Sequence, residues 1–168
     1  MARAYQAVLG LPVQNQPNLN QFMAKLAEAE MQERASRKTD MFLKLSKLRY
    51  DAVLEQVHCN AERNLSNEKL MAIADCGFID RAENILITGP TGSGKSFLAC
   101  ALGRQACTLG YRTLYFGINR FLEKISLLKL DGTYIKLLNQ IEKAALIVID
   151  GPASAGWVNT TNPAANTD

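Results

Sequence analysis

The sequence predicts an α/β fold, a parallel sheet covered by helices, with a helical extension before it. Three apolar runs, at 85–87, 112–117 and 145–150, alternate with segments of helical periodicity. This alternation is typical of a parallel sheet that is covered on both faces. The first eighty residues contain only helical patterns. A chain of 168 residues suits one domain with such an extension.

The extension, residues 1–80, is predicted to contain three helices. Apolar spacing indicates a first helix over 19–34 and a second over 41–57. A third, short helix is expected to open at Ser66 and to end near Gly77, because serine is a good N-cap and glycine a good C-terminal stop. The apolar side of the first helix is thin, so that helix needs a surface to pack on or stays loosely held.

A basic stretch lies in the extension between Glu33 and Arg49. It holds six basic residues against two acidic ones, although the whole chain carries a net charge of only +3. Concentrated positive charge is typical of a surface that contacts the phosphate backbone of nucleic acid, but a charged run is equally often a solvated helix face. Both interpretations stay open. The six DNA-binding candidates are Arg34, Arg37, Lys38, Lys44, Lys47 and Arg49.

The segment after the first apolar run indicates a chemistry. Its spacing, Gly89-x-x-x-x-Gly94-Lys95-Ser96, is that of a phosphate-binding P-loop, and it stands between a strand pattern and a helix pattern as such a loop requires. Glycines let backbone N–H groups approach phosphate oxygens, while the next helix directs its positive end at the same point. A glycine-rich hairpin before an incidental Lys-Ser would not explain this context. The predicted nucleotide-binding residues are Gly89, Pro90, Thr91, Gly92, Ser93, Gly94, Lys95 and Ser96.

The segments that follow the P-loop alternate regularly between helix and strand patterns. Apolar spacing and turn residues predict a helix over 95–109, a strand over 112–117, a helix through 121–128, a helix over 134–142 and a strand over 145–150. Glycines at 110 and 132 mark the ends of two of these helices.

ATP and Mg²⁺ are the predicted cofactors. Lys95 supplies a point charge for the β and γ phosphates, and the Ser96 hydroxyl is a candidate Mg²⁺ ligand. Asp150 ends the last apolar run. An acid at the end of a buried strand downstream of a P-loop is the expected Walker B aspartate, which holds Mg²⁺ through water. An isolated Asp at a strand end is often only a turn residue, but in this context it completes a Mg·ATP site.

Composition excludes several classes of protein. No apolar run reaches membrane-spanning length, and the mixed N-terminus is a poor signal peptide. The four cysteines form no C-x-x-C pair, and the spacing of Cys100 and Cys107 turns both toward the core. His58 and Cys59 are adjacent but lack a second ligand cluster, so no metal site is expected there. These features favour a soluble protein of the reducing cytoplasm, without a membrane partner.

Together these residues resemble the IstB-like transposase helper ATPases, which are relatives of the DnaC helicase loaders within the AAA+ class of P-loop NTPases. The resemblance covers roughly residues 19–150. It is carried by the P-loop, by the Gly77-Phe78-Ile79 and Gly110-Tyr111-Arg112 segments and by the strand that ends at Asp150. It implies ATP-dependent self-association on DNA and presentation of target DNA to a transposase, with the basic helices contributing to the DNA contact. A helicase loader would instead recruit a replicative helicase.

The sequence departs from the family pattern after Asp150. The family places a second acidic residue next, which polarises the attacking water, whereas this chain has Gly151. Residues 151–168 lack strand or helix periodicity and are expected to form an irregular tail unrelated to the family. On this interpretation the chain is C-terminally truncated, with an incomplete AAA+-like P-loop domain over residues 81–150. The later strands, the sensor residue and the arginine finger of the family would be absent.

This departure leads to two expectations. ATP binding should persist while hydrolysis is weak or absent, because catalysis needs an oriented water and a charge-stabilising arginine. In the family the strand after Asp150 lies between the first and third strands of this sheet, so both would lack a partner here and the fold would be marginally stable. The alternatives to a transposition helper are a helicase loader, a non-enzymatic nucleotide-binding subunit and a small-molecule kinase. The kinase is least favoured, since some eighty residues precede the P-loop.

Overall fold

The computed structural model of the chain describes residues 6, 18–60, 65–151 and 155–160. The chain divides into two compact units, Met1–Asp40 and Met41–Asp168. The first unit contains most of α2 (Leu19–Ser46), a helix of 28 residues that continues into the second unit. Within the described part of the chain, no helix is both long enough and apolar enough to span a membrane.

Helix α2 replaces the two helices predicted over 19–34 and 41–57, so that prediction is wrong. No glycine or proline lies between residues 34 and 41 to interrupt the helix. Two ion pairs of i,i+4 spacing also stabilise the helical turns that lead into the region where a break was expected. These pairs join Glu30 to Arg34 and Glu33 to Arg37. The helix ends at Ser46, and the next residue, Lys47, has a left-handed φ of 56° that interrupts the helical backbone.

The second unit contains the remaining elements. In chain order they are the 3₁₀ helix η2 (Leu54–Gln56), α3 (Asn67–Ala74), α4 (Gly77–Asp80), β1 (Ile85–Thr88), α5 (Lys95–Thr108), β2 (Thr113–Gly117), α6 (Ile118–Leu130), α7 (Tyr134–Glu142), β3 (Leu146–Asp150) and β4 (Ala155–Thr160). Every helix and strand predicted between residues 66 and 150 is present. The side chain of Ser66 caps α3 as expected, since it accepts a hydrogen bond from the Lys69 N–H.

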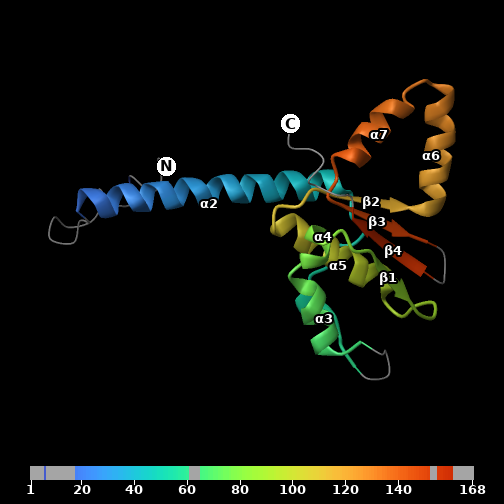
Figure 1. The fold of residues 1–168 in the computed structure, drawn as a ribbon, viewed down its shortest axis with the longest axis horizontal. Coiled ribbons are helices and arrows are strands. Elements are labelled where there is room, and N and C mark those ends of the chain that lie inside the picture. Colours follow the sequence, from blue (N-terminus) through green and yellow to red (C-terminus); the bar gives the residue numbers. More distant parts are fainter. Residues whose placement is uncertain (1–5, 7–17, 61–64, 152–154, 161–168) are drawn as a thin grey trace. The chain divides into compact units, whose positions relative to one another are not determined.

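The four strands form one sheet with the order β1-β4-β3-β2, as Figure 1 shows. Strands β2 and β3 pair in parallel, whereas β4 is antiparallel to both β1 and β3. Strands β1, β2 and β3 therefore all run in the same direction. This confirms the parallel arrangement predicted for the three strands that the sequence indicated.

Strand β4 contradicts the expected irregular tail after Asp150. Its Val158 lies opposite Ile85 of β1 on one side and Val148 of β3 on the other. Strands β1 and β3, which were expected to lack a partner, are both hydrogen-bonded to β4. Unpaired strand edges can be satisfied by any extended segment that reaches them, and β4 begins only five residues after β3 ends. The backbone of β4 forms these hydrogen bonds, and the sequence of β4 has no alternation of apolar and polar residues. Hydrophobic periodicity therefore did not predict this strand.

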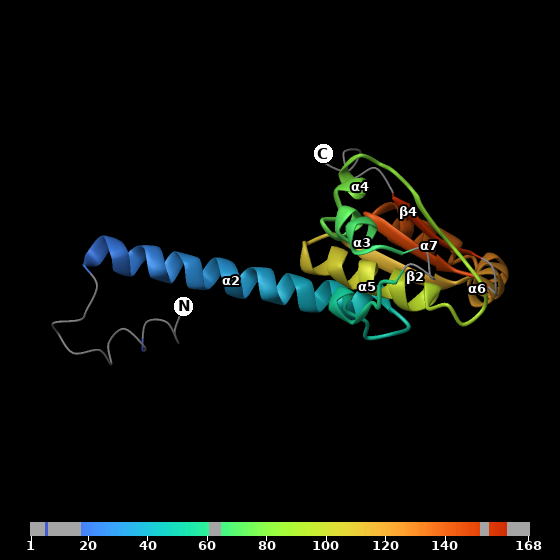
Figure 2. The ribbon, with the colours of Figure 1, turned by 90° about the horizontal axis from the view of Figure 1, so that it is seen from below.

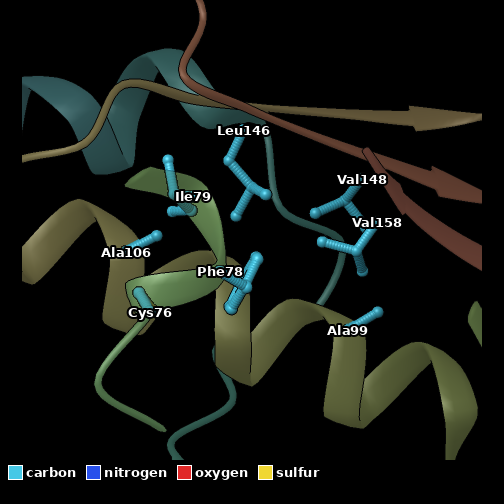
Figure 3. Close-up of a cluster of buried hydrophobic side chains, with 8 residues drawn as sticks. All are labelled: Cys76, Phe78, Ile79, Ala99, Ala106, Leu146, Val148 and Val158. Atoms are coloured by element: carbon cyan, nitrogen blue, oxygen red, sulfur yellow. The ribbon is translucent and has the colours of Figure 1, made fainter. Parts of the chain in front are cut away.

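Helices cover both faces of the sheet. Helix α5 contacts all four strands and lies along one face of the sheet (Figure 2). Ile141 of α7 packs with Leu114 and Ile147, which point to the other face. The core on the α5 side contains small residues of the helix, three strand residues and part of the segment before β1. Figure 3 shows this cluster, which consists of Cys76, Phe78, Ile79, Ala99, Ala106, Leu146, Val148 and Val158.

Residues 41–80 also belong to the compact unit that holds the sheet. Ala52 is fully buried against Cys100 and Ala101 of α5, and Leu70 of α3 packs with Leu102 of the same helix. The division expected at residue 80 therefore differs from the division between the two units, which falls after residue 40. The segment that contains Ala52 is irregular, and periodicity in its sequence did not predict that it packs on α5.

Candidate nucleotide-binding site

The P-loop connects β1 to α5, and its backbone has the conformation that the motif requires. Gly92 and Gly94 have φ angles of 80° and 85°, in a region that residues with a side chain rarely adopt. No atom lies within 4 Å of a Cβ built on either residue, so conformation rather than crowding requires glycine there. Gly94 is also the N-cap of α5, so the free N–H groups of the helix begin at the loop.

Lys95 folds back across the loop. Its Nζ donates hydrogen bonds to the carbonyl oxygens of Gly89, at 2.9 Å, and Pro90, at 2.7 Å. These bonds hold the ammonium group beside the backbone that the motif assigns to phosphate binding. An ammonium group has three donors, so it can contact a phosphate oxygen while it keeps a bond to the loop.

Ser96 and Asp150, 54 residues apart in the sequence, meet at the carboxyl end of β3. Ser96 Oγ donates a hydrogen bond to Asp150 Oδ1 at 2.7 Å. The Asp150 side chain is only 9% exposed. It is the last residue of β3 and lies beside Gly117, the last residue of the parallel strand β2. The carboxyl ends of parallel strands are where open α/β sheets bind their ligands.

The oxygen atoms of Ser96 and Asp150 fit a magnesium ion. Mg²⁺ prefers oxygen ligands, keeps several waters and is usually bound by one or two protein groups together with phosphates. A hydroxyl oxygen has two lone pairs besides its hydrogen. Ser96 can therefore bind the metal and still donate its hydrogen to Asp150.

Two further side chains contact Asp150, and motif analysis missed both. Tyr115 Oη donates a hydrogen bond to Asp150 Oδ2 at 2.6 Å, and Arg49 Nη1 lies 3.5 Å from the same oxygen. Burial, followed by the hydrogen bond to Asp150, raises the pKa of Tyr115, so its hydroxyl stays protonated. The alternation of β2 was a usable signal for Tyr115, because it points this residue to the α5 face, where Asp150 also lies. No local pattern marks Arg49 as a partner of Asp150.

Two adjoining cavities open at this end of the sheet. The loop cavity, about 420 Å³, is lined by P-loop residues together with Arg49, Tyr50, Phe97 and Asp150. The basic cavity, about 560 Å³, is lined by the start of α6 together with Lys47, Arg49, Tyr115 and Arg120. Arg49, Asp150 and Gly151 line both. Of the predicted P-loop residues, Thr91, Gly92, Gly94, Lys95 and Ser96 line the loop cavity, whereas Gly89, Pro90 and Ser93 are absent from this lining.

The structure divides the six basic candidates into two groups. Arg34 and Arg37 lie on α2 in the first unit, where each pairs with a glutamate, and Lys38 follows them. Lys44 is on the same helix within the second unit. Lys47 and Arg49 come after α2 and line the basic cavity instead. The second unit thus brings Lys47 and Arg49 together with Asp150, which the sequence pattern did not indicate.

The fold and the site define a class. A P-loop between a strand and a helix, with an aspartate at the end of a parallel strand against the loop serine, is the arrangement of a P-loop NTPase fold. The sequence matches the family described as IstB-like ATP binding protein over residues 1–162. The chain therefore belongs to the IstB-like ATP-binding family.

Individual relatives are proteins of bacterial insertion sequences. The chain is 33% identical over 151 residues to a protein named as an ATP-binding protein of insertion sequence IS1162 in Pseudomonas fluorescens. It is 33% identical over 150 residues to insertion sequence ATP-binding protein y4pL of Sinorhizobium fredii, and 29% identical to an ATP-binding protein of IS5376 in Geobacillus stearothermophilus. Each match covers 89% of this chain and 65%, 61% and 60% of the respective relative, so the chain spans less than two thirds of their length.

Proposed function

We propose that this chain binds Mg·ATP and serves an insertion sequence as an ATP-binding helper of DNA transposition. The observation that carries the ATP site is the 2.7 Å hydrogen bond from Ser96 to Asp150, which joins the P-loop to the carboxyl end of β3. Transposition is favoured over helicase loading because the three relatives compared above are named as insertion-sequence proteins. The transposase of the same element is the partner that this role requires.

In this proposal the nucleotide lies along the loop cavity. The phosphates are bound by the loop N–H groups and Lys95, and Mg²⁺ is held by Ser96 and, through water, by Asp150. Tyr50 and Phe97 line the same cavity, and their ring centroids are 6.4 Å apart.

We further propose that hydrolysis is weak. Asp150 is the only carboxylate among the described residues that line the loop cavity, and the next residue is Gly151 rather than a second acid. A lone Walker B aspartate holds the metal, but nothing there orients an attacking water. Phosphate release by the purified chain should therefore not exceed that of a Lys95→Ala variant. Release well above that level would contradict the proposal.

DNA contact is proposed for the exposed cations of α2. The side chains of Arg34 and Arg37 are 76% and 74% exposed, and Lys38 and Lys44 are exposed as well. The glutamates paired with Arg34 and Arg37 offset part of the charge. These cations therefore suit a non-specific contact with the DNA phosphate backbone, which weakens steeply with added salt. The joint change Lys38→Gln and Lys44→Gln should lower DNA affinity and the slope of its salt dependence, as measured by fluorescence anisotropy.

The ATP site is tested by calorimetry with Mg·ATP on the purified chain. We expect Lys95→Ala to weaken binding by roughly tenfold or more, because it removes the ammonium that contacts the phosphates. Asp150→Asn should lower affinity when Mg²⁺ is present and have little effect without it, because this residue acts through the metal. Lys143→Ala, at an exposed position outside both cavities, is the matched control and should bind as the wild type does. Absence of measurable binding by folded wild-type protein would refute the proposal.

A further inference from the structure

Arg49 lies where the loop cavity and the basic cavity meet. Its guanidinium group is 3.5 Å from Asp150 Oδ2 and 5.2 Å from the centroid of the Tyr50 ring. The Arg49 side chain is 60% exposed, whereas Asp150 is almost fully buried. The charge of Arg49 thus faces a buried carboxylate on one side and open cavity on the other.

A metal ion bound at Asp150 would disfavour the present position of Arg49. Its two oxygens already have three partners, namely Ser96, Tyr115 and Arg49. The hydroxyl groups of Ser96 and Tyr115 are neutral and can remain when a cation binds. The guanidinium group is positively charged, so a dication beside Asp150 would repel it over a few ångströms.

A bound triphosphate offers Arg49 a new anionic partner close by. Mg²⁺ and Lys95 together carry less positive charge than a fully ionised triphosphate carries negative charge, so a further cation in the loop cavity is stabilising. Among the described residues that line that cavity, Lys95 and Arg49 are the cationic ones. The metal site at Ser96 and Asp150 marks the terminal-phosphate end of the cavity, and Arg49 is at that end. Its planar fork of donors suits phosphate oxygens.

The backbone beside Arg49 is anchored, so only its side chain needs to move. Leu48 packs against the buried cluster of Ala52, Cys100 and Ala101. The Tyr50 ring approaches Phe97, the residue that follows Ser96 on α5. These contacts fix the segment against the helix that starts at the P-loop.

We propose that Arg49 binds the terminal phosphate of Mg·ATP in the same chain, exchanging Asp150 for the phosphate when the metal enters. This inference rests on the proposed ATP site and assigns Arg49 to nucleotide rather than to DNA. Nucleotide binding then releases the ion pair between the segment after α2 and the end of β3. ADP lacks the terminal phosphate, so it gains much less from Arg49.

The test compares Mg·ATP and Mg·ADP binding by calorimetry for the wild type and Arg49→Gln. The variant should lose about tenfold or more in ATP affinity, the range expected for one charge-assisted contact, while ADP affinity falls less than about threefold. Arg49→Lys keeps the positive charge but lacks the planar guanidinium group, so it should recover part of the ATP affinity. This variant also replaces Arg49→Gln in the test if the glutamine variant does not fold. Arg120 lines the basic cavity, whereas Arg49 is the arginine that pairs with Asp150, so Arg120→Gln is the matched control and should bind both nucleotides as the wild type does.

The outcomes separate this inference from the ATP site itself. If the wild type binds ATP and the Arg49 variants bind ATP and ADP as the wild type does, the inference is wrong and the ATP site stands. An equal loss of affinity for ATP and for ADP would also overturn the inference, because the contact of Arg49 would then not involve the terminal phosphate. If folded wild type binds neither nucleotide, both proposals fail.

Discussion

At the scale of single residues, three of the four cysteines are core side chains. Cys76, Cys100 and Cys107 are fully buried, whereas Cys59 is partly exposed. Burial is the largest cause that raises the pKa of each buried thiol, and it raises the pKa of Cys76 to about 11. A thiol that stays protonated is a weak nucleophile. Alkylating reagents should therefore modify Cys59 first in the folded protein.

The raised pKa of Cys76 predicts a loss of stability at alkaline pH. The unfolded thiol has a pKa near 9.0, so above that pH the unfolded chain binds fewer protons than the folded one. The free energy of unfolding should be unaffected by Cys76 below pH 9 and should fall on the order of 1 kcal/mol between pH 9 and 10.5. Urea unfolding of the wild type and Cys76→Ala at pH 7.5, 9 and 10.5 checks this. An equally steep decline in both proteins would contradict it.

The same scale shows what short motifs can and cannot predict. Lys95 and Ser96 follow from the loop pattern, and Asp150 follows from its place at the end of an apolar strand. Tyr115 and Arg49 reach the site through pairing of β2 with β3 and through packing of the segment after α2. The alternation of β2 indicates only which face Tyr115 points to, and no pattern of nearby residues indicates that Arg49 contacts Asp150.

At the scale of elements, helix α5 depends on one glycine for its close approach to the sheet. A Cβ built on Gly103 would lie 2.9 Å from Leu48 Cδ2, 3.4 Å from Thr113 Cγ2 and 3.5 Å from Val148 Cγ2. Alanine needs only a small movement of the flexible Leu48 side chain. A larger side chain would also press on β2 and β3.

Gly103→Val should therefore destabilise the second unit by about 1–3 kcal/mol, the usual cost of overpacking a filled core. Thermal or urea unfolding measures the change. Lys124→Val places the same side chain on the exposed surface of α6 and serves as the control for its low helix propensity. If both variants lose the same stability, crowding at Gly103 is not the cause.

Helix boundaries were predictable where residues that start or stop helices are present. Ser66 and Gly94 precede α3 and α5, and α7 begins shortly after Gly132. Helix α2 was divided in error, because a change of composition between residues 34 and 41 is not a helix stop. Continuity there comes from the lack of a breaker and from ion pairs one turn apart.

At the scale of the whole molecule, β4 is the feature that the sequence did not reveal. It fills the position between β1 and β3 and supplies Val158, only 1% exposed, to the core beneath α5. The expectation of two unpaired strands, and of marginal stability on that ground, no longer holds. Buried strands can be read from long apolar runs, but a short segment recruited by hydrogen bonding to two open edges cannot.

Val158→Ala tests whether β4 is part of the cooperative core. Removing two carbon atoms from this buried site should cost about 2 kcal/mol, from lost burial and the cavity that remains. Urea unfolding gives the change, and hydrogen exchange of the β1 and β3 amides should quicken in the variant. Val53→Ala, at a partly exposed position outside the core clusters, should cost clearly less. Wild-type stability for Val158→Ala would exclude β4 from the core.

The direction of β4 also bears on how the protein folds. A strand parallel to β3 in the same position would need a crossover of a dozen or more residues before it could pair. Here only four residues separate β3 from β4, so the contacts between the two strands are local in sequence and forming them loses little chain entropy. Folding rates rise as contact order falls. The middle of the sheet can therefore assemble early as a hairpin, against which β1 and the P-loop that follows it then dock.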